Sequence, residues 1–552
     1  MRRRTVLKGL TAAAVLPVLA ACDGNKAATS AQSAGTRTGP FSLVFDRSKY
    51  TVHTQTIATG DGHKKVTYHF YAAIPYVAHP VNTEYQSLDV SVPVQIDGQA
   101  VDTASAPILF NINVGGYTSS PVSGVAGAAG GAPGGGGAPG GGGAPGGGTP
   151  PTEAGGPGGA GAPSGGSAPG STNGAVPGSG ITIGGNGQMV DNGQLALAAG
   201  YVVVSPGCRG RDNVTKSGRY YGKAPAAIVD LKAAVRYVRH NKGRLPGNPD
   251  WIVATGGSAG GALSVLLAAS GDSPMYDSYL TQLGAANVSD AIFASASYSP
   301  ITDLDHADMA YEWMYGHLPL STGELVDQTY SQQLRAAFTG YQASLGLTRQ
   351  DGSGALTAGN YAGYLVRAYL QPAATKTLGA LPEAKRAEYL TDNPWITWSG
   401  GQATFTWARF LDHIGTRLKS VPAFDSFTLS NAENIEFGDA NTNARHFTPY
   451  SLRHATGNPH AQLASDLPPK IKMMNPMYFL AWKNPSRARN WWIRTGTLDT
   501  NTAHTVVGNL AARAASLGDN VNSSMYWDGG HAVNYDAPEF MRWIATVTGY
   551  TG

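Results

Sequence analysis

The feature that most constrains the fold is a strand, a glycine-rich turn and a helix in direct succession. Residues 251–255 (WIVAT) predict a buried strand, the next six residues read GGSAGG, and residues 262–269 predict an apolar helix. The same reasoning predicts further strands at 106–113, 201–205, 491–495 and 523–527, and helices at 225–240 and 537–547. Because strands alternate with helices, we expect a mostly parallel sheet with helices on both faces.

Two segments depart from this alternation. Residues 302–463 are rich in Trp, Tyr and polar residues, and we predict that they form an inserted lid domain between two parts of the core, 41–301 and 464–552. Residues 121–180 contain 36 Gly or Pro, one charge and no aromatic residue. Such a composition buries too little apolar surface to offset its ordering entropy, so this segment is predicted to be disordered.

The N-terminus has the pattern of an export signal. Residues 1–22 combine a cationic start, which resembles a twin-arginine signal, with an apolar stretch that ends in Leu-Ala-Ala-Cys22. This ending resembles a bacterial lipobox, in which Cys22 is acylated, and residues 23–40 then form a tether. The alternative is an ordinary secretory signal. We therefore expect an exported cell-surface or periplasmic lipoprotein, which contacts the membrane only through its lipid and leaves Cys208 without a disulfide partner.

Charge and ligand spacing exclude several functions. The formal net charge is +3, and four of the positive charges lie in the leader, so the remaining chain is close to neutral. No basic footprint for nucleic acid remains. No histidine spacing indicates a metal site, and we expect no cofactor.

Ser258 is the predicted nucleophile. The pattern Gly256-x-Ser258-x-Gly260 between a strand and a helix is typical of a nucleophile elbow, where small neighbours allow a sharp turn that presents the hydroxyl. The alternative for Ser258 is a simple helix N-cap. A serine hydroxyl needs a base, and in this arrangement an acid and then a histidine follow the serine along the chain.

The acid and the base are predicted from the ends of the last two strands. Asp499 follows strand 491–495, and His531 follows strand 523–527. Asp528 is the rival acid, but it is too close to His531 in sequence to approach it from a separate loop. The oxyanion is predicted to bind the N–H of Ala259 and the loop at Gly115 and Gly116, although Gly115 and Gly116 also fit a simple turn.

The sequence resembles the bacterial tannases (subtype B) of the α/β-hydrolase superfamily. The similar blocks read NTEYQSL (82–88), VGGY (114–117), GKAPAAIVDLKAAVRY (222–237), SAGGALS (258–264), MAYEW (309–313) and RTGTLD (494–499). The resemblance implies an α/β-hydrolase fold and hydrolysis of galloyl esters through an acyl-enzyme. It assigns the triad to Ser258, Asp499 and His531.

The same resemblance implies which residues hold the substrate. In that family a Lys and a Glu of the lid bind the phenolic hydroxyls of the acyl ring, and they match Lys419 and Glu433, with Glu436 as the alternative glutamate. The family also has an Asp two residues after the triad Asp, where this chain has Asn501. Because that charge is absent, a strict preference for galloyl esters does not follow from the resemblance.

Three hypotheses follow for the function. The first is an exported serine esterase for small aromatic esters, galloyl-type or another phenolic type such as hydroxybenzoyl or hydroxycinnamoyl. The second is a non-catalytic surface lipoprotein that binds phenolics. The third is a peptidase of the prolyl oligopeptidase type, but too little chain precedes Ser258 for the propeller of such enzymes.

Overall fold

A ten-stranded mixed sheet organises the chain, in the order β1-β2-β3-β6-β5-β7-β8-β11-β12, with β4 paired to β3. The six strands from β6 to β12 on this path are parallel, whereas β1 to β4 are antiparallel. The strands are β1 (Thr51–Thr59), β2 (Gly62–Pro75), β3 (Ser87–Ile96), β4 (Gln99–Ala100), β5 (Ile108–Asn111), β6 (Val202–Pro206), β7 (Ile252–Gly257), β8 (Ala294–Tyr298), β11 (Asn490–Gly496) and β12 (Asn520–Tyr526), and a separate hairpin consists of β9 (Thr397–Ser399) and β10 (Gln402–Thr404).

The computed structural model describes residues 39–122, 191–482 and 484–551. The leader with Cys22, nearly all of the tether and most of the Gly/Pro-rich segment lie outside the described residues. Residue contacts divide the chain into Met1–Pro40 and Phe41–Gly552, and every described helix and strand belongs to the second unit.

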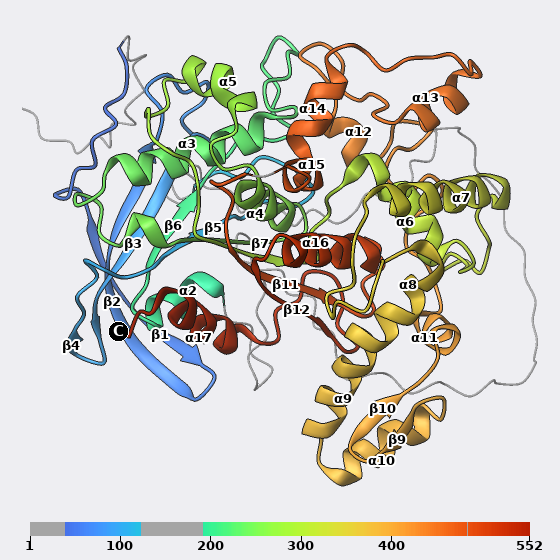
Figure 1. The fold of residues 1–552 in the computed structure, drawn as a ribbon. Helices are drawn as coiled ribbons and strands as arrows, with labels where there is room; N and C mark the ends of the chain where they lie inside the picture. Colours follow the sequence, from blue (N-terminus) through green and yellow to red (C-terminus); the bar gives the residue numbers. More distant parts are fainter. Residues whose placement is uncertain (1–38, 123–190, 483, 552) are drawn as a thin grey trace, which may run out of the picture. The chain divides into compact units, whose positions relative to one another are not determined.

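Helices cover both faces of the sheet, as Figure 1 shows, with α3, α4 and α16 on one side and α2 and α17 on the other. The helices are α2 (Asn192–Ala198), α3 (Ala226–His240), α4 (Ala259–Ala269), α5 (Asp277–Gln282), α6 (Leu304–Tyr315), α7 (Gln328–Ser344), α8 (Ala358–Leu365), α9 (Gln371–Ala380), α10 (Glu383–Asp392), α11 (Trp407–Ile414), α12 (Ala432–Glu436), α13 (Pro449–Thr456), α14 (Leu467–Met474), α15 (Pro476–Leu480), α16 (His504–Ser516) and α17 (Ala537–Thr548), with short helical turns at Pro249–Trp251, Pro274–Tyr276 and Val366–Leu370.

The apolar strands bury both of their faces because side chains alternate across a strand. Ile252 and Ala254 of β7 belong to the core on the side of α3 and α4, whereas Val253 belongs to the core on the side of α2 and α17. This two-sided burial explains the apolar runs from which the sequence predicts β5, β6, β7 and β11. The edge strand β12 is also predicted, although its first five residues are exposed or half-buried. The predicted fold class, an α/β-hydrolase fold with a mostly parallel sheet, is confirmed.

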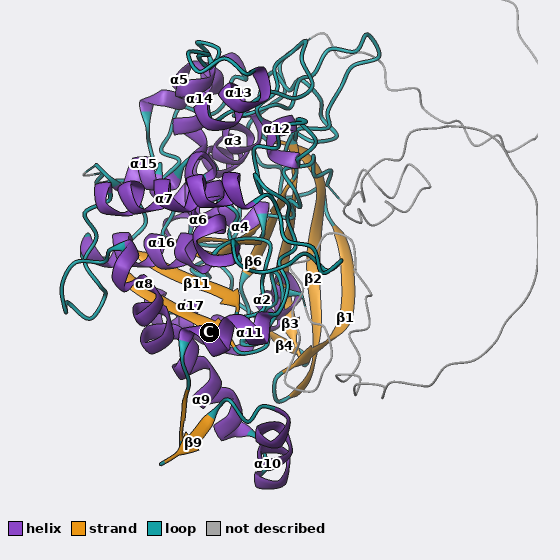
Figure 2. Ribbon diagram, turned by 90° about the vertical axis from the view of Figure 1, so that its right-hand side faces the viewer, coloured by secondary structure: helices purple, strands orange, loops and turns teal. Residues whose placement is uncertain are grey.

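The chain between β8 and β11 is mainly helical and contains the segment predicted as a lid. Its apolar side chains belong to the same core as α3 and α4. Helices α9 and α10 and the β9–β10 hairpin lie together at one end of the protein (Figure 2). We call residues 383–414, which contain α10, the hairpin and α11, the arm.

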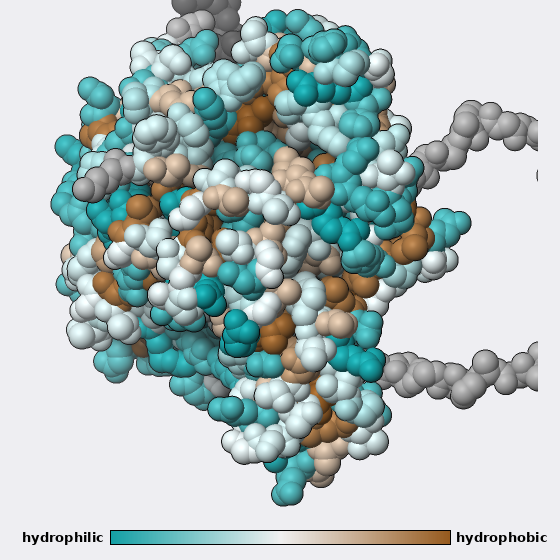
Figure 3. Space-filling model, turned by 45° about the vertical axis from the view of Figure 1, so that its right-hand side comes forward, coloured by the Kyte–Doolittle hydropathy of each residue, from teal (hydrophilic) through white to brown (hydrophobic). Residues whose placement is uncertain are grey.

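Large hydrophobic side chains that are exposed in the described chain include those of Val52, Leu325, Leu418 and Trp482. On the face in Figure 3, hydrophobic residues are scattered among hydrophilic ones. Among the described residues, no helix is both long and apolar enough to cross a bilayer. Cys208 is buried and free, and burial raises the pKa of its thiol well above the ordinary value.

Candidate active site

Ser258 lies in a strained turn between β7 and α4. Its backbone has φ 56° and ψ −123°, a conformation that L-residues rarely adopt and that costs of order 1–3 kcal/mol. The neighbouring glycines are required by close backbone approach. A Cβ on Gly256 would lie 2.5 Å from the carbonyl carbon of Gly260, and a Cβ on Gly260 would lie 2.8 Å from the oxygen of Ile112. The turn therefore has the backbone of a nucleophile elbow, with a partly exposed serine at its tip.

The backbone of Ser258 is fixed to the chain that follows β8. Its N–H donates to the oxygen of Tyr298 at 2.9 Å, and its own oxygen accepts from the N–H of Ile301 at 3.3 Å. These bonds hold a strained residue in place on both sides, which is the condition under which such strain persists.

His531 and Asp499 form a hydrogen-bonded pair. Nδ1 of His531 lies 3.0 Å from Oδ1 and 2.9 Å from Oδ2 of Asp499. The carboxyl group is buried, whereas the imidazole is about one quarter exposed. Burial acts to raise the pKa of Asp499, but the charge of His531 and hydrogen bonds from His531 and the N–H of Asn501 outweigh it and hold that pKa below its ordinary value. The acid therefore stays ionised and can orient an Nδ1–H donor, which leaves Nε2 for proton transfer.

The loops of Ser258 and His531 pack against each other. A Cβ added to Gly257 would lie 3.1 Å from the Cβ of Ala532, so the residue before the serine contacts the residue after the histidine. The structure thus brings all three predicted triad loops to the carboxyl ends of parallel strands at the same edge of the sheet, β7, β11 and β12, with β8 between β7 and β11.

Ser299 connects the loops of the predicted base and acid, and the sequence analysis did not identify it. It has φ 48°, its hydroxyl accepts from the N–H of Ala532 at 3.0 Å, and it lies 3.3 Å from the hydroxyl of Thr495. The Thr495 hydroxyl in turn lies 3.4 Å from Oδ2 of Asp499. Ser299 thereby ties the histidine loop to the strand that precedes the acid. Its position directly after a strand was the available signal, but that strand was not predicted.

Asp528, the rival acid, faces other residues. Its Oδ1 lies 2.7 Å from Nε2 of His413, and its Oδ2 accepts from the hydroxyl of Tyr389 at 2.6 Å. Both oxygens are therefore engaged by the arm. This arrangement favours Asp499 as the partner of His531.

The predicted oxyanion donors lie beside the elbow. Ala259 begins α4, so its N–H is among the first-turn groups that lack an acceptor within the helix. The N–H of Gly260 donates to the oxygen of Val114 at 2.9 Å, which brings the exposed loop at Gly115 and Gly116 next to the start of α4. Arg211 Nε donates to the oxygen of Gly116 at 2.6 Å and steadies this loop.

Lys419 interacts with both Glu433 and the predicted triad acid, and the N–H of Asn501 donates to that acid. Burial lowers the pKa of Lys419, and Glu433, Asp308 and Asp499 oppose this shift through their charge. The ammonium lies 3.6 Å from the centre of the Phe424 ring and, within the described chain, makes no hydrogen bond. The carboxylate of Glu433, although the residue is only 6% exposed, also has no hydrogen-bond partner among the described residues. Lys419 thus lies within electrostatic range of both Glu433 and Asp499, and Asn501 follows Asp499 by two residues.

Glu436, the alternative to Glu433, has a different environment. It is fully buried, and neither carboxyl oxygen has a hydrogen-bond partner in the described residues. Burial raises its pKa to about 8, against the opposing charges of Lys223 and Arg211. The raised pKa favours the neutral form of Glu436, and the side chain lacks the exposure expected of a substrate ligand, which favours Glu433.

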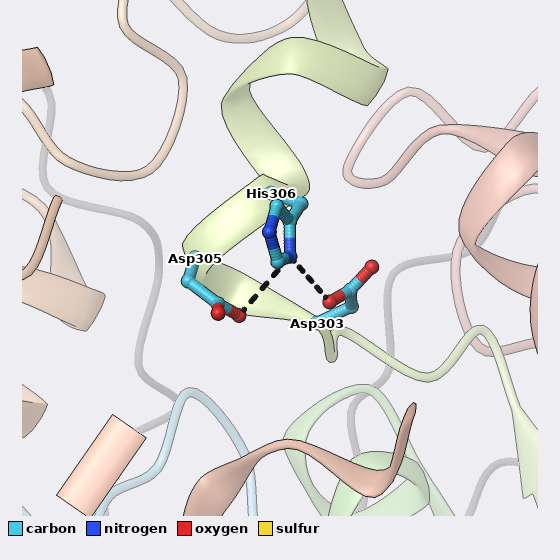
Figure 4. A group of neighbouring side chains, drawn as sticks. All are labelled: Asp303, Asp305 and His306. Atoms are coloured by element: carbon cyan, nitrogen blue, oxygen red, sulfur yellow. Dashed lines mark hydrogen bonds and ion pairs between the residues drawn. The ribbon is translucent and has the colours of Figure 1, made fainter. Parts of the chain in front are cut away.

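One cluster of acidic and histidine side chains lies near the start of α6 (Figure 4). Nδ1 of His306 lies 3.0 Å from Oδ1 of Asp303, and Nδ2 of Asn475 donates to Asp303 and Asp305 at 2.8 Å each. Burial opposes protonation of His306, but the charge of Asp303 outweighs it and raises the pKa of His306 to about 10. The imidazolium supplies the positive charge that two adjacent carboxylates require, so the cluster is an ion-pair network at the entry to the helical segment.

Known proteins similar to this chain are esterases. The family model described as BD-FAE matches residues 175–334. The esterase LipQ of Mycobacterium tuberculosis is 40% identical over 90 residues, which are 16% of this chain and 20% of LipQ, so the match spans one fifth of that relative. Among solved structures, the tannase of Fusobacterium nucleatum is 30% identical with a TM-score of 0.72, and the alignment covers 92% of this chain and 100% of that one.

The tannin acyl hydrolase of Lactobacillus plantarum is 31% identical with a TM-score of 0.70, over 92% of this chain and 99% of that one. The fold and these matches define the class as the esterases of the α/β-hydrolase superfamily. Within that class, the chain belongs to the tannase family, which confirms the resemblance seen in the sequence.

Proposed function

We propose that this chain is a serine esterase that hydrolyses esters of hydroxylated aromatic acids through an acyl-enzyme. The observation that carries the proposal is the pairing of His531 Nδ1 with both carboxylate oxygens of buried Asp499, beside a serine on a strained elbow. This is the arrangement that serine acyl transfer needs, with a nucleophile, a base and an acid that orients the base.

Acylation begins when Nε2 of His531 takes the proton of Ser258 as its Oγ attacks the ester carbonyl. The resulting tetrahedral oxyanion is stabilised by the N–H of Ala259 and by the loop at Gly115 and Gly116, because fixed donors at this position cost no reorganisation during the reaction. Asp499 stabilises the imidazolium without becoming protonated. His531 then protonates the leaving alcohol, which leaves the acyl group on Ser258.

Deacylation repeats these steps with water. His531 removes a proton from water, which attacks the acyl carbon, and the second oxyanion uses the same donors. Its collapse returns the proton to Oγ of Ser258 and releases the aromatic acid. No cofactor or metal is required for this sequence of proton and acyl transfers.

The acyl ring is proposed to lie between Lys419 and Glu433. Both groups lack hydrogen-bond partners in the described chain, and phenolic hydroxyls satisfy a cation through their oxygen and a carboxylate through their hydrogen. The neighbours support this choice, since one tannin acyl hydrolase is described in complex with ethyl gallate and another structure in complex with 3,4-dihydroxybenzoate. Galloyl-type esters are therefore the first substrate class.

Asn501 favours a second candidate, an esterase for less hydroxylated acids. An amide at this position can hydrogen-bond one hydroxyl but has no charge, and hydrogen bonds to charged groups are worth about 1–2 kcal/mol more than neutral ones. An acid with fewer hydroxyls, such as 4-hydroxybenzoate or ferulate, loses less from this change than gallate does.

The substrate class is tested with a panel of esters. We would measure kcat/KM of the chain from Asp23 onward for methyl gallate, methyl 4-hydroxybenzoate, methyl ferulate and p-nitrophenyl acetate, with Ser258→Ala as the blank. A lead of methyl gallate by tenfold or more supports the galloyl assignment. A lead of another phenolic ester moves the assignment to that acid, and no turnover of any ester supports the non-catalytic phenolic-binding lipoprotein.

We further propose that the protein is exported and anchored by a lipid on Cys22. The support is the sequence alone, namely the twin-arginine pattern and the Leu-Ala-Ala-Cys22 ending of the leader. Expression of the full chain in a bacterial host with radiolabelled palmitate is expected to label the wild type and not Cys22→Ser. Equal labelling of both, or of neither, contradicts the anchor.

A further inference from the structure

The histidine loop is attached to the arm through the carboxylate of Asp528. His413 of α11 and Tyr389 of α10 each engage one oxygen, at 2.7 and 2.6 Å, although Tyr389 is 139 positions away in sequence. Asp528 is about one third exposed and His413 about one fifth, so the pair is partly shielded from solvent. Because its two oxygens bond to side chains of two separate helices, the carboxylate of Asp528 is held from two directions.

The residue before Asp528 strengthens this attachment. Nε1 of Trp527 donates to the hydroxyl of Tyr389 at 2.7 Å, and the Trp527 ring stacks on His413 with centroids 5.7 Å apart and planes 5° apart. Trp527 is buried, and the rings of Trp395 and Phe405, also from the arm, lie 6.1 and 5.3 Å from it. The arm therefore encloses the last residue of the chain before the loop that carries His531.

The backbone between this anchor and the catalytic histidine is short. Asp528 has φ 53°, and its N–H donates to the hydroxyl of Thr497 at 2.9 Å. Only Gly529 and Gly530 separate it from His531, and glycines have little conformational preference of their own. The N–H of Gly529 donates to the oxygen of Tyr526 at 3.0 Å, and its oxygen accepts from the N–H of Leu498 at 2.9 Å. The side chain of Asp528 adds a further attachment at the end nearer to β12.

We propose that Asp528 is a positioning residue, through which the arm holds His531 in line with Ser258. The inference depends on the proposed serine mechanism and adds a role for a segment that is distant in sequence from the triad. It also explains why an acidic residue next to the histidine loop is not the triad acid, since its carboxylate is occupied by Tyr389 and His413.

The test removes the attachment from the side of the arm and leaves Asp528 unchanged. The double variant Tyr389→Phe/His413→Phe keeps an aromatic ring at both positions beside Trp527. It loses the two hydrogen bonds to the carboxylate and the one that the Tyr389 hydroxyl accepts from Nε1 of Trp527. Because misplacement of a catalytic group costs turnover more than ground-state binding, we expect kcat to fall roughly tenfold or more with KM within about twofold. Labelling of Ser258 by a fluorophosphonate, which also needs the base, is expected to slow in parallel.

Two further variants separate positioning from general stability. Asp528→Asn retains one acceptor oxygen and tolerates the positive φ, so its kcat should lie between those of the wild type and the double variant. Lys376→Ala removes another contact between the helical segment and the core, with Glu539 at 3.3 Å on α17, far in sequence from the histidine loop, and should leave kcat unchanged. Thermal unfolding of each variant is measured beside the kinetics.

The outcomes are distinct. A double variant with wild-type kcat, whether or not its melting temperature falls, overturns the positioning role. Equal loss of kcat in Lys376→Ala and the double variant also overturns it, because the effect would then belong to the whole segment. If Ser258→Ala retains the hydrolysis of the wild type, the proposed function itself fails, and this result is recognised without the arm variants.

Discussion

Replacing Lys419 by methionine tests how the acyl ring is recognised. The substitution keeps an unbranched side chain and removes the cation, whose contact in the described chain is the face of Phe424 at 3.6 Å. A cation–π contact of this kind is worth about 0.5–2 kcal/mol, and the relief of desolvating the ammonium offsets part of it, so the fold should be retained. One lost hydrogen bond between Lys419 and a phenolic hydroxyl costs about 1.5–3 kcal/mol.

At about 1.4 kcal/mol for each factor of ten, this loss lowers kcat/KM for methyl gallate by roughly 10- to 150-fold. The assay compares methyl gallate with p-nitrophenyl acetate, whose acyl group has no phenol. The acetate also reports the general effect of removing a charge that acts on Asp499. Lys385→Met, at an exposed lysine paired with Glu388, is the matched control.

The expected result is a loss that is at least tenfold larger for gallate than for acetate, with Lys385→Met unchanged. An equal fall for both esters refutes the contact with the acyl ring and assigns Lys419 an electrostatic effect on the triad. An unchanged kcat/KM for gallate refutes both roles.

Three other substitutions test separate parts of the account. Asn501→Asp restores a carboxylate near the ring and should raise the ratio of kcat/KM for methyl gallate over methyl 4-hydroxybenzoate by about 5- to 30-fold, from 1–2 kcal/mol; an unchanged ratio argues against contact with the ring. Ser299→Ala leaves the N–H of Ala532 without its acceptor, so urea unfolding should show a loss of about 1–3 kcal/mol and kinetics a fall in kcat larger than any rise in KM; wild-type values would remove its positioning role. Glu436 has its pKa raised by burial to about 8, so between pH 4.5 and 8 the folded chain keeps a proton that the unfolded chain releases, and stability falls as the pH rises through this window. In urea unfolding, the stability of Glu436→Gln relative to the wild type should therefore increase as the pH rises from 5 to 8. If the free energies of unfolding of the two proteins change with pH in parallel, the raised pKa of Glu436 is contradicted.

Most of the strands that the sequence predicts are apolar on both faces, and the edge strand β12 is the exception. Residues 251–255 and 201–205 are continuous apolar runs because α3 and α4 cover one side and α2 and α17 the other. Strand β8, with the sequence ASASY, is fully buried but has no such run, since small side chains let α4 approach the sheet. The antiparallel strands β1 and β2 were missed for a different reason, because many of their side chains remain exposed and mixed in polarity.

The residues of the candidate site also fall into two groups, those that local sequence patterns predict and those that they do not. Local patterns and chain order predict Ser258, Asp499 and His531, because each residue lies in a loop that follows a recognisable strand. The supporting residues are not visible in this way. Ser299 follows the strand that was missed, and the contacts of Tyr389 and His413 with Asp528 join positions more than one hundred residues apart. Such pairings depend on how the helical segment packs, which no local pattern specifies.

The most direct test of the central claim is the rate of methyl gallate hydrolysis by the chain from Asp23 onward and by its Ser258→Ala variant. The account predicts turnover by the wild type and a loss of at least about 10³-fold in kcat for the variant, since a triad acts as a unit. Similar turnover by both proteins would contradict a serine mechanism at this elbow, and an inactive wild type towards every ester of the panel would contradict the assignment as an esterase.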